Sequence, residues 1–147
     1  MPKAFKFRLE TLLEVRRLRE DLARRDLAVA RGKVLEQNRK LQALLSEEEE
    51  GKKELRALKQ REIDLVRLRL LEGYLNSLER GLRRGFQVLE ELVRDEAEKR
   101  RALAEAVKGV RVLERLEERQ RRAYLYELDR QEQKFLDEVA QNMERPA

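Results

Sequence analysis

The sequence predicts an all-α fold, a long two-helix antiparallel coiled-coil hairpin with an overhanging C-terminal helix. Three observations predict it. Charged residues make up 44% of the 147 residues and hydrophobic residues 41%, a balance that suits helices burying one narrow stripe each. The two prolines are Pro2 and Pro146, so no proline interrupts the interior. Apolar residues recur at alternating steps of three and four along both halves of the chain, as in a coiled coil.

The first helix is expected at about residues 7–59, after a basic leader that contains Phe5 and Phe7. Most positions of its heptad frame hold Leu, Val or Ala. That frame comprises Leu9, Leu13, Arg16, Glu20, Ala23, Leu27, Ala30, Val34, Gln37, Leu41, Leu44, Glu48, Gly51, Leu55 and Leu58. A neighbouring stripe, expected to widen the apolar face near its start, comprises Leu12, Val15, Leu18 and Leu22.

A reversal of the chain is expected at about residues 60–65, although no Gly or Pro marks a turn there. The step from Leu58 to Leu68 does not fit an unbroken heptad frame. Asp64 is suited to cap the second helix, since its carboxylate can accept hydrogen bonds from free backbone N–H groups. The alternative is one continuous helix with a local change of register, which would need a partner chain to bury its stripe.

The second helix is expected at about residues 66–141, so that residues 1–147 form a single coiled-coil domain. Its frame comprises Leu68, Leu71, Leu75, Leu78, Leu82, Gly85, Leu89, Leu92, Glu96, Lys99, Leu103, Ala106, Val110 and Leu113. Glu96 and Lys99 interrupt this seam with charge. Buried polar residues at such positions often fix the register of a coiled coil, but both side chains are also long enough to reach water.

The C-terminal part of the second helix is expected to lack a partner within the chain. If the chain reverses near residue 62, the first helix pairs back only to about residue 118, and residues from about Arg119 to Met143 overhang. One side of this stretch carries Tyr124, Leu128, Phe135 and Val139. An exposed amphipathic stripe of this kind predicts a docking site for another protein, with folding back or fraying as the alternative.

Composition argues against an enzyme. The chain has no Cys and no His, which excludes the usual zinc sites, thiol nucleophiles and histidine triads. Its carboxylates lie on predicted exposed faces, not in a pocket that would separate their pKa values for acid–base catalysis. We therefore expect no catalytic residue, no metal and no cofactor. No apolar run approaches the roughly 20 residues of a membrane span, and no secretory signal is apparent, so a cytoplasmic protein is expected.

A basic coiled coil that binds nucleic acid is an alternative function. The net charge is +5, and arginine clusters could contact phosphate backbones. However, acidic residues lie within a turn of nearly every cluster, and the few aromatic residues offer no base-stacking platform. A homomeric structural coiled coil is a third interpretation. No nucleic acid is expected as a partner.

Two segments resemble the flagellar export protein FliJ family. The opening, from Phe5 to Arg16, resembles the start of that family, with the pattern Phe-x-Phe-x-Leu-Glu-x-Leu-Leu. The ending, residues 113–120 followed by 129–140 with the pattern Asp-Glu-x-Ala, resembles its C-terminal signature. These two patterns, at the right separation, are more specific than the heptads, and the resemblance covers essentially the whole chain.

The resemblance implies a non-catalytic central stalk of the flagellar type III export apparatus, similar to the gamma subunit of rotary ATPases. The implied partners are the hexameric export ATPase FliI, its regulator FliH, the membrane export-gate protein FlhA and export chaperones, which the protein would help to recycle. The implied location is the cytoplasmic face of the inner membrane at the flagellar basal body, without direct membrane insertion. A stalk protein of an injectisome is the alternative within this class.

The resemblance also implies two sets of partner-binding residues. The set for the export gate comprises Leu44, Tyr74, Leu78 and Gly81. Aromatic positions of the family on the first helix fall near Glu47 and Gly51 here, and Leu44 and Leu78 are also predicted seam residues. By analogy with a rotary stalk, the end that carries both termini enters the ATPase ring. The set for the export ATPase comprises Arg119, Gln120, Arg122 and Gln133.

Overall fold

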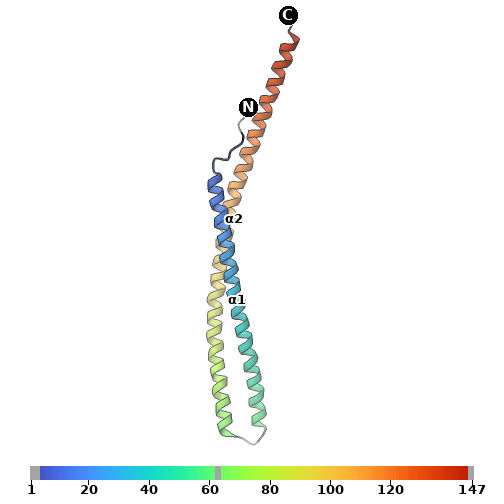
Figure 1. Ribbon diagram of the computed structural model, residues 1–147. Helices are drawn as coiled ribbons and strands as arrows, with labels where there is room; N and C mark the ends of the chain where they lie inside the picture. Colours follow the sequence, from blue (N-terminus) through green and yellow to red (C-terminus); the bar gives the residue numbers. More distant parts are fainter. Residues whose placement is uncertain (1–3, 62–63, 146–147) are drawn as a thin grey trace. The chain divides into compact units, whose positions relative to one another are not determined.

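The computed structural model describes residues 4–61 and 64–145, which form two long helices, α1 (Glu10–Lys59) and α2 (Leu65–Glu144) (Figure 1). No strand occurs among these residues, and the predicted all-α class is confirmed. The first helix, expected from about residue 7, begins at Glu10, and the second, expected to end near residue 141, continues to Glu144. Within the described residues, neither helix is apolar enough over a sufficient length to cross a membrane.

The break between the helices lies where the heptad frames fall out of phase. α1 ends at Lys59, and Asp64 caps α2. Its Oδ1 atom accepts hydrogen bonds from the backbone N–H groups of Val66, at 3.1 Å, and Arg67, at 3.4 Å. The predicted cap is therefore confirmed, and the alternative of one continuous helix is wrong. Residues 62 and 63 of the expected reversal lie outside the described residues.

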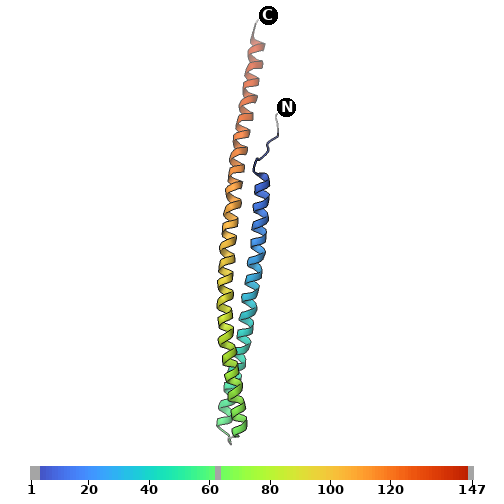
Figure 2. The same ribbon diagram turned by 90° about the vertical axis from the view of Figure 1, so that its left-hand side faces the viewer.

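The chain divides into two compact units, each described here by itself. The terminal unit comprises the residues up to Leu22 and those from Ala104 onward, and the hairpin unit comprises Ala23–Leu103. In each unit, α1 and α2 lie side by side in both views and run antiparallel (Figures 1 and 2). The two-helix hairpin is confirmed, whereas a single domain for the whole chain stays a prediction.

The seam between α1 and α2 follows the predicted heptad frame in both units. Every predicted frame position is buried or half-buried, and most residues between them are exposed. The most buried side chains of the hairpin unit are Leu27, Ala30, Leu41, Leu78 and Leu82. Removing apolar surface from water stabilises the fold by roughly 25 cal/mol per Å². The narrow apolar stripe of each helix is thus covered by the other helix.

Two seam positions of the hairpin unit are glycines, and each accommodates a leucine from the opposite helix. A Cβ atom at Gly85 would lie 2.5 Å from Leu41 Cδ2, and one at Gly51 would lie 2.6 Å from Leu75 Cδ2. The amide nitrogen Nε2 of Gln37 also donates a hydrogen bond to the Gly85 carbonyl, at 3.0 Å. Each glycine lowers helix propensity by about 1 kcal/mol relative to Ala. The close approach of the leucine offsets this loss.

The terminal unit has a core to which the non-helical leader contributes. Phe7, Leu13, Val110 and Leu113 are buried together, and other apolar residues pack against them. The leader therefore does more than precede α1, because the ring of Phe7 is only 6% exposed. Burial of such a ring stabilises the fold by about 1.5–3 kcal/mol.

The overhang of α2 begins later than expected from the sequence. The Phe5 ring lies 5.6 Å from the ring of Tyr124 and 5.5 Å from the guanidinium carbon of Arg121. The expected start at Arg119 is thus wrong, because an aromatic side chain of the leader covers α2 without belonging to a helix. Every described residue from 129 onward is exposed, and within the terminal unit α2 extends beyond the leader (Figure 2).

The second apolar stripe on α1 does not widen the buried face, which corrects the expectation. Its members are exposed: Leu12 by 39%, Val15 by 40%, Leu18 by 63% and Leu22 by 56%. A helix turns about 100° per residue, so Leu18 is rotated by roughly 140° from the buried Leu13. The two-helix seam is too narrow to cover both stripes.

Candidate partner-binding surfaces

The first predicted set of binding residues lies mostly within the seam of the hairpin unit. Leu78 is buried and Leu44 is half-buried. A Cβ atom at Gly81 would lie 3.9 Å from Leu44 Cδ1, so the structure brings these two residues together. Tyr74, in contrast, is 48% exposed. Among the four residues, Tyr74 presents the most accessible side chain, and the contact of this set with a partner stays a prediction.

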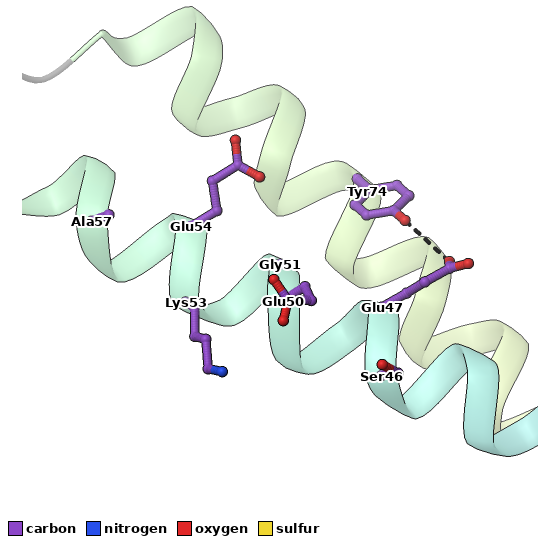
Figure 3. A pocket seen from close by; sticks show the side chains of 8 residues that line it. All are labelled: Ser46, Glu47, Glu50, Gly51, Lys53, Glu54, Ala57 and Tyr74. Carbon is purple, nitrogen blue, oxygen red and sulfur yellow. Dashed lines mark hydrogen bonds between the residues drawn. The ribbon is translucent and has the colours of Figure 1, made fainter.

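Tyr74 lines a pocket of about 550 Å³ between the two helices of the hairpin unit (Figure 3). The phenolic O–H donates a hydrogen bond to Glu47 Oε2 at 3.2 Å, and the two side chains point toward each other (Figure 3). This hydrogen bond raises the pKa of Tyr74, and desolvation and the negative charge of Glu47 raise it further. Tyr74 is therefore held as a neutral donor. The other lining residues are Ser46, Glu50, Gly51, Lys53, Glu54 and Ala57.

The same pocket shows why two positions of α1 can lack aromatic residues. Leu75 occupies the space above Gly51, where a side chain would meet its Cδ2 atom. Glu47 accepts the hydrogen bond from Tyr74. The aromatic ring that lines this pocket is that of Tyr74, on α2. A sequence pattern does not show these contacts, because they depend on which residues of the two helices lie opposite each other.

The second predicted set lies on the C-terminal part of α2, and all four residues are exposed. At about 100° per residue, Arg119, Arg122 and Gln133 lie within roughly 60° of one another around the helix. Gln120 is turned by about 100° from Arg119, so it lies on another face. The Nη2 atom of Arg122 donates to Glu118 Oε1 at 2.6 Å. The structure thus brings three of the four residues to one face.

The sequence interpretation missed a row of arginines that overlaps this set. Arg111, Arg115 and Arg119 follow one another at steps of four, which places them along one helical face. Their spacing was visible in the sequence. It was hidden among many other arginines, and only the structure shows which of those have acidic partners.

Glu96, which interrupts the apolar seam with charge, forms an ion pair that links the two helices. The Glu96 side chain is only 14% exposed, and its Oε1 atom lies 3.6 Å from Arg31 Nε on α1. Arg100, on its own helix, donates to the same oxygen. Lys99 instead reaches toward water, with a side chain that is 40% exposed and 3.9 Å from Asp95. Of the two interrupting residues, Glu96 alone is held within the seam.

The stability contributed by Glu96 is expected to depend on pH. The hydrogen bond from Arg100 lowers the pKa of Glu96 below its ordinary value of 4.5; burial opposes this effect, and the charges of Arg100 and Arg31 add to it. A carboxylate with a lowered pKa in the folded state stabilises the fold above its unfolded pKa. That stability is lost as the pH falls through the folded pKa. The melting temperature of Glu96→Gln should therefore lie below that of the parent at neutral pH and approach it as the pH falls below the ordinary pKa of 4.5.

Thermal unfolding from pH 3 to pH 7, followed by circular dichroism, measures this difference. Glu98→Gln is the matched control, because Glu98 is an exposed neighbour on the same helix. Its melting temperature should follow that of the parent across the range. A difference for Glu96→Gln that stays constant with pH would show that the carboxylate charge has no role.

Comparison with known families gives a match over nearly the whole described chain. A family model described as "Flagellar FliJ protein" matches residues 5–145. The match includes the leader, both helices and the exposed end of α2. No curated protein and no solved structure matches the chain.

Proposed function

The chain belongs to the flagellar FliJ protein family, and on this premise we propose that it is the central stalk that couples the export ATPase to the export gate. The family is a non-catalytic component of the flagellar export apparatus. Its implied partners are the ATPase hexamer FliI, the regulator FliH, the gate protein FlhA and export chaperones. Hydrolysis would take place in the ATPase, and this chain would change its rate by binding.

The observation that carries the proposal is the exposed apolar face at the end of α2. Leu125 is 54% exposed, Leu136 61%, and Met143 82%. At about 100° per residue, these three residues lie within roughly 20° of one another around the helix. Phe135 and Val139, exposed by 64% and 36%, extend the same face. An apolar face on a single helix is a typical docking element for a groove or ring in another protein.

A single inserted helix also suits the proposed mechanism. A ring of identical subunits is symmetric, whereas one amphipathic helix has an apolar and a polar side. Subunits that face different sides of the helix would therefore experience different contacts, and their active sites would differ in conformation. Arg119, Arg122 and Gln133, which lie beside the apolar face around the helix, are the proposed contacts with the ATPase. Gln120 would contact a different part of the ring.

The proposed contact with the gate lies in the hairpin unit. Tyr74 supplies an exposed ring with its O–H directed to Glu47. Leu44, Leu78 and Gly81 support this region from the seam and set the separation of the two helices. We propose that the gate binds over Tyr74, and that the three seam residues act by shaping the surface.

Addition of the purified full-length chain to the cognate export ATPase tests the function. We expect a higher hydrolysis rate and a larger hexamer fraction, measured by phosphate release and by light scattering. Tyr74→Ala is the internal control: it should stimulate the ATPase as the parent does but bind the cytoplasmic part of the gate less tightly. If the parent chain changes neither hydrolysis nor assembly, the stalk function is ruled out.

A further inference from the structure

The terminal unit carries the three arginines noted above, Arg111, Arg115 and Arg119, on the face of α2 that is turned away from the seam. Leu113 is buried against α1, whereas the three arginines are exposed, and Val112 between them is 64% exposed. We call these three residues the arginine row. Since successive members differ by four residues, their side chains are neighbours along one face.

The arginine row lacks the glutamate partners that five other arginines of α2 have. Those five pair with a glutamate four residues earlier, in Glu79–Arg83, Glu90–Arg94, Glu96–Arg100, Glu117–Arg121 and Glu118–Arg122. A shorter arginine step of four, Arg80 and Arg84, occurs in the hairpin unit. In the row, each step of four joins two arginines instead. Within the described residues, none of the three forms an ion pair with a carboxylate. Like charges at this spacing destabilise a helix slightly, so the row is unfavourable for the isolated chain.

An apolar notch lies within the same face. It has a volume of about 240 Å³ and is lined by Val112, Arg115, Leu116 and Arg119. Leu116 is half-buried and packs against the core of the terminal unit, so one wall of the notch is fixed. The surface therefore offers space for an aliphatic side chain beside guanidinium groups. Guanidinium groups bind carboxylates in a bidentate manner.

We propose that the arginine row and its notch dock an acidic helical segment of the export ATPase. Carboxylates of that segment, at steps of four, would face the arginines, and an aliphatic side chain would enter the notch. This inference rests on the proposed function, because that function makes the ATPase the partner of the terminal unit. A nucleic acid fits this surface less well. Glu114 and Glu118 flank the row and would repel phosphate groups, and an apolar notch offers phosphate no hydrogen-bond donor.

The variant Arg115→Glu tests the inference in the full-length chain. Arg115 is the centre of the row, so its reversal places a repulsive charge beneath the partner's carboxylates. At about 0.15 M salt we expect the Kd for the ATPase to rise by about tenfold, with a weaker dependence of Kd on salt than in the parent. The new glutamate stands four residues from an arginine on each side but three residues from Glu118, so the attractive and repulsive changes oppose each other and the melting temperature should change little. Weaker binding together with undiminished stability separates docking from unfolding.

Lys33→Glu is the matched control, because Lys33 is an exposed residue of α1 in the hairpin unit and its reversal changes the net charge equally. It should leave the Kd for the ATPase within about twofold of the parent. If the parent binds the ATPase and Arg115→Glu binds equally well, the inference is wrong and the proposed function stands. If the parent itself does not bind, both fail. A labelled DNA duplex that binds the parent but not Arg115→Glu, with ATPase affinity unchanged, would assign the row to nucleic acid instead.

Discussion

Leu41→Ala is expected to lower the free energy of unfolding by about 3 kcal/mol. Leu41 is 2% exposed, and its Cδ2 atom occupies the space where Gly85 would carry a side chain. Truncation removes buried apolar atoms, and the opposite glycine has no side chain with which to fill the cavity. Urea unfolding followed by circular dichroism measures the loss. Leu45→Ala on the same helix is the control, because Leu45 is 43% exposed and should cost less than about 1 kcal/mol.

The same pair provides a sharper test through a double-mutant cycle. In the Leu41→Ala background, Gly85→Ala should recover about 1 kcal/mol or more, because Ala favours the helix and its methyl group enters the cavity. In the parent, that methyl group would lie 2.5 Å from Leu41 Cδ2, so the leucine must shift and the gain is reduced or reversed. We therefore expect the two substitutions to be coupled by about 1 kcal/mol. Strictly additive effects would contradict the assigned contact.

Truncation of the chain after Tyr126 is expected to abolish stimulation of the export ATPase while the remaining helices stay folded. The cut removes Phe135, Leu136 and Met143 but retains the contact of Phe5 with Tyr124. The buried cluster of the terminal unit is also untouched, so the melting temperature should change little. ATP hydrolysis and thermal unfolding, measured on the same preparations, separate the two effects. Full stimulation by the truncated chain would place the ATPase contact elsewhere.

Paired point substitutions at the same end distinguish the apolar face from helix length. Phe135→Ala with Val139→Ala should weaken binding of the ATPase by about tenfold or more, because central apolar anchors dominate most interfaces. Lys134→Ala with Glu138→Ala is the matched control on other sides of the helix, and it should retain most of the affinity. Equal losses in the two double variants would mean that the face has no special role.

Several features of the fold could be predicted because they depend on local periodicity. The seam positions follow from the alternation of apolar residues, and burial was found at every one of them. Asp64 was identified as a cap from its side chain and its place before an apolar run. The packing of the leader against α2 could not be predicted from periodicity. Phe5 reaches Tyr124 through a tertiary contact that no helical period encodes.

The candidate surfaces were predicted less completely, and the reason is the same. A heptad frame identifies Leu44 and Leu78 as inward residues, but it does not reveal that Tyr74 donates to Glu47 across the hairpin. It also gives no means of knowing which arginines have acidic partners. Arg31 finds Glu96 on the other helix. The arginine row finds no carboxylate partner among the described residues.

The sequence by itself determined two long helices, the stripe that each one buries, and the break between them. These properties follow from the spacing of residue types along the sequence. The tertiary structure decided which residues meet across the seam. The leucines over Gly51 and Gly85, the bridge at Glu96 and the cover that Phe5 places on α2 all depend on that pairing. It arises because side-chain volume and charge select one register among several that satisfy the same apolar pattern.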